Sequence, residues 1–155
     1  MMHVSSSRFF SASINASGRT QNNMKVSKIS AVTLLVSDMK RSVEFYSKIP
    51  NFKIVYGGSE ARFTSFLIDD VVKSYLNLKL STEFSPTGHV SENTRIIFYT
   101  DDVDGLFAYM QDDKTVSTLG KFESKPQDAT WGERFFHMLD PDGYKMSFAT
   151  PLGDE

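Results

Sequence analysis

The spacing of apolar residues becomes regular at Ile29 and from there predicts alternating strands and helices. Residues 29–36 are mostly apolar and rich in β-branched side chains, which indicates a strand. Three apolar residues then recur at the i, i+4 and i+7 positions of one helix face: Met39, Val43 and Tyr46. We expect Ser37 to cap this helix and Pro50 to end it.

Three further strands are predicted after the first helix, at residues 52–56, 62–68 and 74–80. The pair Gly57 and Gly58 supplies a turn between the first two of them. A polar stretch at 81–93 then predicts a surface loop. The first half of the chain therefore has the order strand, helix and three strands.

The same order begins again in the second half of the chain. Residues 95–99 predict a strand, and four apolar residues mark the following helix: Val103, Leu106, Phe107 and Met110. Asp102 stands 64 positions after Asp38, and the same offset places Phe107 on Val43, so both helices should bury the same face. A weak strand near Val116 and strands at 133–139 and 144–150, joined by an Asp-Pro-Asp-Gly turn, complete the second unit.

Composition and charge narrow the class of protein. A chain of 155 residues with 40% apolar content is long enough for one domain and short for two. A net charge of -2 gives no reason to expect nucleic acid or an anionic membrane surface as a partner. The absence of cysteine excludes disulfides, thiolate metal sites and catalytic thiols. Since no apolar run approaches the roughly 18 to 20 residues of a membrane span, we expect a soluble protein.

The start of the chain differs from the rest. Residues 1–24 are rich in Ser and contain no acid, and the first acidic residue is Asp38. Three interpretations stay open: an organellar transit peptide, a disordered leader, or a translation start at Met24. We expect one domain over residues 25–152 and a cytoplasmic location, or an organellar one if the leader is a transit signal.

Three segments together resemble the vicinal oxygen chelate superfamily, which contains glyoxalases, bleomycin resistance proteins and dioxygenases. They are the strand-helix junctions at 36–46 and 99–103 and the Asp-Pro-Asp-Gly turn with its flanks at 140–145. The resemblance covers residues 27–150. It implies an α+β fold in which two βαβββ modules form a curved, cup-like mixed sheet, and it implies a homodimer.

Members of this superfamily usually hold a divalent metal with His, Glu or Gln on four strands. The resemblance places Ala31, Asn77, Arg95 and Ser147 at these positions. A methyl group donates no lone pair, a guanidinium repels a cation, and a hydroxyl or an amide is a weak ligand. We therefore expect no metal and no other cofactor.

Three side chains remain as candidates for a ligand site. Arg95 could bind a carboxylate or phosphate, or could pair with an acid of the protein itself. Trp131 could wall a cavity, although a lone tryptophan is more often part of the core. His137 is the best available acid or base if its face lines the cup, and is otherwise structural, which we favour because the sequence places no carboxylate partner beside it.

These observations favour a metal-independent protein of the bleomycin-resistance type that binds a small, possibly anionic molecule. The expected ligand-binding set is Ala31, Asn77, Arg95, Trp131 and Ser147, with His137 as a weak catalytic candidate. The alternative is an enzyme of the same superfamily, a lyase, isomerase or dioxygenase similar to lactoylglutathione lyase, with atypical site residues. A third possibility is a structural role in which phenylalanines close the cup.

Overall fold

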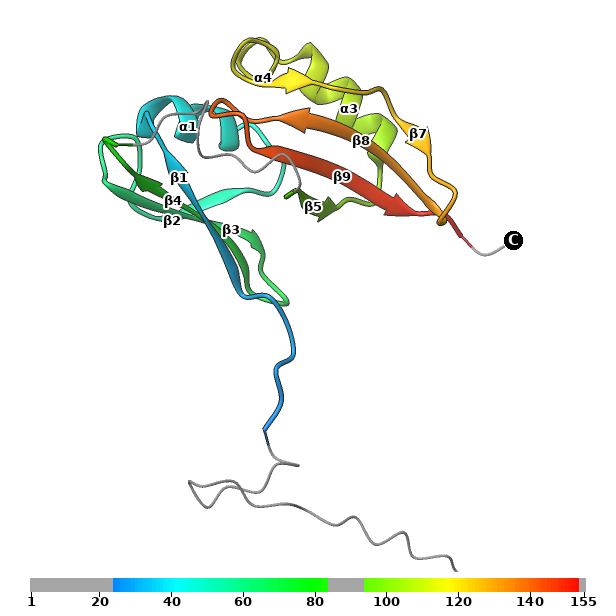
Figure 1. The fold of residues 1–155 in the computed structure, drawn as a ribbon, viewed down its shortest axis with the longest axis horizontal. Coiled ribbons are helices and arrows are strands. Elements are labelled where there is room, and N and C mark those ends of the chain that lie inside the picture. Colours follow the sequence, from blue (N-terminus) through cyan, green and yellow to red (C-terminus); the bar gives the residue numbers. More distant parts are fainter. Residues whose placement is uncertain (1–23, 84–93, 154–155) are drawn as a thin grey trace, which may run out of the picture.

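The computed structural model describes residues 24–83 and 94–153, which form two mixed sheets beneath a layer of helices (Figure 1). The leader expected at residues 1–24, except for Met24, lies outside the described residues. So does most of the loop expected at residues 81–93. In the described part of the chain, no helix is both long and apolar enough to span a membrane.

The first sheet contains the strands of the first module in the order β1-β4-β3-β2, with β1 parallel to β4 and the other pairs antiparallel. Its elements are β1 (Ala31–Val36), α1 (Met39–Tyr46), β2 (Lys53–Tyr56), β3 (Phe63–Asp69) and β4 (Ser74–Leu80). Each of these elements overlaps the segment predicted from periodicity.

The second sheet repeats this arrangement in the order β5-β9-β8-β6, with β5 parallel to β9 and β7 paired to β8. Its module consists of β5 (Ile96–Tyr99), α3 (Val103–Asp112), α4 (Lys114–Leu119), β6 (Lys121–Phe122), β7 (Gln127–Asp128), β8 (Glu133–Leu139) and β9 (Lys145–Pro151). The α+β fold and its repeat are therefore confirmed, as two mixed sheets with one module each.

Equivalent aspartates begin the two long helices. The carboxylate of Asp38 accepts the backbone N–H three residues on at 3.0 Å, and Asp102 does the same at 2.9 Å. The predicted cap at Ser37 is wrong, because the Ser37 hydroxyl instead donates to the carboxylate of Asp142, 2.5 Å away. The 64-residue repeat thus extends to the helix caps.

The weak strand expected near Val116 is wrong, because this residue lies in α4. Asp113 caps that helix by accepting the backbone N–H groups of Thr115 and Val116 at 2.9 and 3.0 Å. The cap and the burial of the Val116 side chain outweigh the strand preference of its β-branched residues. Two short strands, β6 and β7, pair along β8 in the place of one edge strand.

The core lies between the sheets and the helices and is strongly aromatic. Phe148 stacks between Phe98 and Phe136, with ring centroids 5.4 and 5.3 Å apart. The largest fully buried side chains include Tyr46, Phe45, Phe66, Phe136 and Phe148. We call the other side of each sheet, which faces away from the helices, its open face (Figure 1). Large apolar side chains stay exposed there, for example Leu35 on β1 and Ile97 and Tyr99 on β5.

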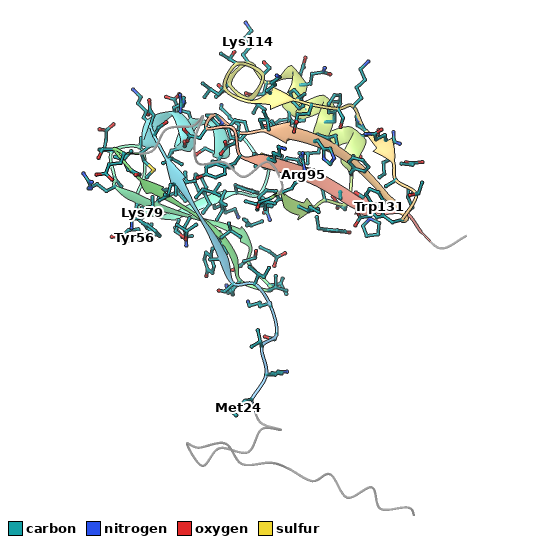
Figure 2. All side chains as sticks on the ribbon, viewed as in Figure 1. Met24, Tyr56, Lys79, Arg95, Lys114 and Trp131 are labelled. Atoms are coloured by element: carbon teal, nitrogen blue, oxygen red, sulfur yellow. The ribbon has the colours of Figure 1, made fainter. Side chains whose placement is uncertain are left out.

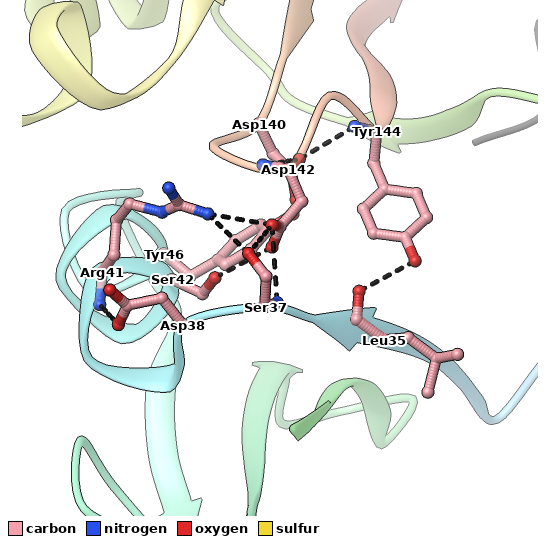
Figure 3. Close-up of polar contacts among 9 residues, drawn as sticks. All are labelled: Leu35, Ser37, Asp38, Arg41, Ser42, Tyr46, Asp140, Asp142 and Tyr144. Atoms are coloured by element: carbon pink, nitrogen blue, oxygen red, sulfur yellow. Dashed lines mark hydrogen bonds and ion pairs between the residues drawn. The ribbon is translucent and has the colours of Figure 1, made fainter. Parts of the chain in front are cut away.

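The Asp-Pro-Asp-Gly turn between β8 and β9 joins the two modules (Figure 3). Both of its aspartates are buried, and each binds the first module. Asp142 accepts from the Ser37 hydroxyl and from Arg41 Nη2, the latter at 2.9 Å, while Asp140 accepts from the Tyr46 hydroxyl at 2.6 Å. One of the three segments that carry the sequence resemblance therefore also connects the two modules through buried polar contacts.

Candidate functional site

Three strands bring polar side chains together on the open face of the second sheet. The register of the sheet places Ile97 of β5, Ser147 of β9 and His137 of β8 side by side. Because residues at i and i+2 share a face of a strand, Arg95 and Phe135 belong to the same face. This group of five residues is called the second-sheet cluster below.

His137 and Ser147 form the centre of this cluster. The Nδ1 atom of His137 lies 2.5 Å from the Ser147 hydroxyl, and Ser147 is only 2% exposed. Partial burial lowers the pKa of His137, and the positive charge of Arg95 lowers it further, whereas Glu123 acts in the opposite direction. The imidazole is therefore neutral at pH 7, and its Nε2 atom is the one left for a ligand.

Arg95 reaches across the sheet toward this histidine. Its Nη1 atom donates to the carbonyl oxygen of Met146 at 3.0 Å, and its Nη2 atom lies 3.4 Å from a carboxylate oxygen of Glu123. The sequence left open whether Arg95 pairs with an acid of the protein itself. In the structure this acid is Glu123. A single contact of this length leaves other guanidinium N–H groups for a ligand.

Trp131 is 70% exposed, so this lone tryptophan is not part of the core. The indole stacks on the Phe135 ring with centroids 6.0 Å apart and planes at 17°, and its Nε1 atom donates to Glu133 at 2.9 Å. Phe135 in turn contacts the His137 ring, with centroids 4.6 Å apart. An aromatic row therefore runs along the open face from Trp131 to His137.

Ala31 and Arg95 line one cavity of about 400 Å³ where the two modules meet, together with Tyr75 and Ile97. A larger cleft of about 690 Å³, lined by Phe52, Ile68 and Tyr99 among others, contains none of the predicted site residues. Since chemistry and not size identifies a site, we place the candidate site at the second-sheet cluster and the adjoining smaller cavity.

Asn77 does not join this cluster. It holds the equivalent place on the first sheet, where its side-chain oxygen accepts from Ser65 at 2.7 Å and its nitrogen donates to Thr33 at 3.3 Å. Both ends of its amide are thus occupied within its own sheet. Among the predicted residues, the structure groups Arg95, Ser147 and His137 and connects Trp131 to them through Phe135. Ala31 lines the same cavity as Arg95, and Asn77 lies apart.

The site residues do not fit the divalent metal that the fold family implies. Within residues 24–83 and 94–153, no three His, Asp or Glu side chains gather in a way that could hold a metal ion. At the family positions, Ala31 offers only a methyl group and Arg95 is a cation, while the Ser147 hydroxyl is engaged by His137. No step of a mechanism is therefore assigned to a metal.

Sequence reasoning missed Glu123 and Ser124, which border the cluster. The backbone N–H of His137 donates to the Ser124 hydroxyl at 3.0 Å, and Glu123 binds Arg95. Both residues lie between the short strands β6 and β7, where the chain has no hydrophobic period. No signal in the sequence identifies them.

Comparison with known families gives a match to the Glyoxalase/Bleomycin resistance protein/Dioxygenase superfamily over residues 28–148. No curated protein matches the chain in sequence.

Solved structures that resemble the chain share its fold at low sequence identity. The genomically encoded fosfomycin resistance protein FosX from Listeria monocytogenes has a TM-score of 0.62 and 16% identity, over 83% of this chain and 96% of that one. A glyoxalase-related enzyme from Fulvimarina pelagi has a TM-score of 0.60 and 15% identity, over 83% and 94%. The bleomycin resistance determinant encoded on transposon Tn5 has a TM-score of 0.58 and 16% identity, over 81% and 98%.

Proposed function

The chain belongs to the glyoxalase/bleomycin resistance protein/dioxygenase superfamily, and on that premise we propose that it binds an anionic small molecule without a metal. The ligand lies on the open face of the second sheet. The observation that carries the proposal is that the Arg95 guanidinium reaches Glu123, whose backbone N–H donates to the carbonyl oxygen of His137 at 2.9 Å. A fixed guanidinium thus takes the place that a metal would need.

The chemistry of the cluster suits an oxyanion. Guanidinium N–H groups bind carboxylates and phosphates through charged, directional hydrogen bonds. In the tautomer in which the Ser147 hydroxyl donates to Nδ1, the neutral ring of His137 carries its hydrogen on Nε2 and can donate it to a ligand oxygen. Arg95 attracts and orients the anion as a metal would, but it does not act as a Lewis acid.

A second copy of the chain completes the site in this proposal. The open faces of both sheets carry large exposed side chains, among them Phe63 on β3 and Ile97 and Tyr99 on β5. Exposed apolar surface of this kind marks interaction sites. We therefore propose a homodimer in which the partner covers the open faces and turns them into an enclosed cup.

The test compares two arginines on opposite faces of the second module. Arg95→Met removes the open-face cation, while Arg134→Met removes an arginine that binds Asp104 and Asp128 on the helix side. We expect Arg95→Met to weaken the binding of carboxylate and phosphate probes in calorimetry by about 1.5 to 3 kcal/mol, the value of a hydrogen bond to a charged group. Arg134→Met should leave the affinity unchanged.

The structural alternative makes the opposite prediction for the same variant. If Arg95 serves only to pair with Glu123, its replacement lowers the melting temperature, and the parent protein gains no stability from any probe. That pair of results would refute the proposed function.

The lowered pKa of His137 favours a second candidate, a metal-free enzyme that uses this residue as an acid or base. The candidate reactions are those of the superfamily: a lyase, an isomerase or a dioxygenase-like step. His137→Gln keeps a hydrogen-bonding side chain but cannot exchange a proton at neutral pH. In an enzyme, this variant retains ligand binding and loses turnover, whereas in a binding protein there is no turnover to lose.

A further inference from the structure

We infer that Glu123 is a built-in competitor of the ligand: its carboxylate holds Arg95 in the free protein and leaves it when an external anion binds. This inference rests on the proposed function and concerns the regulation of that same site. It starts from the ion pair between Arg95 Nη2 and a carboxylate oxygen of Glu123, which lie 3.4 Å apart.

This internal contact is weak enough to be exchanged. Hydrogen bonds between a guanidinium and a carboxylate are usually about 2.7 to 2.9 Å long and often come in pairs, whereas Glu123 makes a single contact at 3.4 Å. Both side chains still meet solvent, since 23% of Arg95 and 31% of Glu123 is exposed. The ion pair therefore has the chemistry of a guanidinium with a bound carboxylate, but a poorer geometry.

An incoming anion needs the nitrogen that Glu123 contacts. A guanidinium has two pairs of parallel N–H groups, one at its end and one at its side, and Nη2 belongs to both pairs. The Nη1 atom of Arg95 already donates to the Met146 carbonyl oxygen at 3.0 Å. An anion placed next to the Glu123 carboxylate also meets a like charge, which disfavours both of them. Binding at Arg95 therefore requires the carboxylate to move away.

The backbone lets the Glu123 side chain move alone. The N–H groups of Glu123 and Ser124 donate to the carbonyl oxygen of His137 at 2.9 and 3.3 Å, and the His137 N–H donates to the Ser124 hydroxyl at 3.0 Å. These hydrogen bonds hold the chain at residues 123–124 against β8. Rotation about the side-chain bonds of Glu123 then carries its carboxylate into solvent and leaves the sheet unchanged.

A competitor that is part of the chain lowers the affinity for every anion by the same factor. Only the molecules in which Arg95 is released can bind, so the apparent affinity falls by the fraction that they represent. A minor state of this kind has a population of about 10% or less. Neutralising Glu123 should therefore raise the affinity for different anions equally, by about tenfold or more.

The test uses Glu123→Gln in the full chain, with acetate and inorganic phosphate as probes and NMR titration as the measurement. Arg95 lies across the second module from the helix side that carries Lys114 (Figure 2). The matched control is Asp128→Asn on that helix side, because it removes the same charge from an acid that pairs with an arginine, Arg134, at 2.8 Å.

We expect Glu123→Gln to bind both probes about tenfold more tightly than the parent, with the same gain for each. Asp128→Asn should leave both affinities unchanged. The gain should disappear when Glu123→Gln is combined with Arg95→Met, because the competition is for the guanidinium. A thermal melt checks that each variant is folded.

A second variant, Glu123→Asp, separates displacement from charge repulsion. It keeps the negative charge but shortens the side chain by one methylene group, so the carboxylate no longer reaches Arg95 from the fixed backbone. Competition for Arg95 predicts that this variant gains affinity as Glu123→Gln does. Repulsion alone predicts the affinity of the parent, and that result would overturn the inference.

Two further results separate this inference from the proposed function. If Glu123→Gln binds the probes no more tightly than the parent, or gains equally without Arg95, Glu123 does not compete with the ligand, although the proposed function stands. If neither probe binds to the parent or to Glu123→Gln, the proposed function fails as well. Binding to the variant alone would support the inference, since the internal carboxylate then blocks the parent completely.

Discussion

The hydroxyl of Tyr46 donates to the carboxylate of Asp140 over 2.6 Å, although the two residues stand 94 positions apart in the chain (Figure 3). Tyr46 ends the helix of the first module, and Asp140 begins the turn that joins β8 to β9. Both side chains are buried, so this hydrogen bond is shielded from water. Burial in turn raises the pKa of Tyr46 well above its ordinary value.

Loss of this hydroxyl should destabilise the whole fold. Tyr46→Phe keeps the ring and its packing but leaves a buried carboxylate oxygen without its donor. We expect the free energy of unfolding at pH 7 to fall by about 1.5 to 3 kcal/mol, measured by urea denaturation. The matched control is Tyr109→Phe on α3, because that side chain is 50% exposed and should change stability little. Equal effects of the two substitutions would contradict the role of the buried bond.

The same turn should make stability depend on pH. Burial raises the pKa of Asp140 from 3.8 to about 6, against the opposing effect of the Tyr46 hydrogen bond. The folded protein therefore holds this proton more tightly than the unfolded chain. The resulting stabilisation is complete below about pH 4 and is lost as the pH rises through about 6. At 1.36 kcal/mol for each pKa unit, the change amounts to about 3 kcal/mol.

Asp140→Asn should remove this dependence, because an amide does not titrate in this range. Urea denaturation of both proteins at pH 4.5 and pH 7 measures the effect. His137 has a lowered pKa, so it changes stability in the opposite direction over the same pH range. Because both proteins contain His137, its contribution cancels when the stability of the variant is subtracted from that of the parent at each pH. If the two proteins lose or gain stability in parallel between these pH values, Asp140 does not titrate as described.

Most of the fold could be predicted because its elements obey local rules. The apolar spacing of Met39, Val43 and Tyr46 identified a helix face that is indeed buried. Prediction was wrong where a tertiary contact decides between two local options. Ser37 is a good cap by residue type, but Asp142, which binds it, lies 105 positions away.

The candidate site was less predictable. Alternation along β8 placed His137 on the same face as Phe135, as the structure has them. The repeat placed Arg95 on a strand, whereas β5 begins one residue later, at Ile96. The exposure of Trp131 could not be predicted from the sequence. It depends on stacking against Phe135 and on a loop in which apolar residues do not recur at regular spacing. Glu123 was missed for the same reason.

Purified protein should contain far less than one equivalent of zinc, nickel, iron or manganese, even from a metal-replete medium. The reason is the donor set at the family positions, where Ala31 and Arg95 cannot bind a cation. Elemental analysis by mass spectrometry measures the metal content.

The matched gain-of-function variant is the double substitution Ala31→His and Arg95→His, since these residues line one cavity. We expect it to bind nickel more tightly than the parent. One tight equivalent in the parent would refute metal independence.

A charge on the open face should split the proposed dimer. Tyr99 is 73% exposed on the edge strand β5, whereas Tyr109 is 50% exposed on α3. An aspartate buried in an interface loses its hydration without gaining a partner, which costs several kcal/mol, while one on a solvated helix costs little. Sedimentation at tens of micromolar, roughly the range in which a stable interface is populated, should therefore show a dimer for the parent and for Tyr109→Asp. Tyr99→Asp should sediment as a monomer with unchanged helical content. A parent that is monomeric throughout would exclude the dimer, and a dimeric Tyr99→Asp would move the interface away from β5.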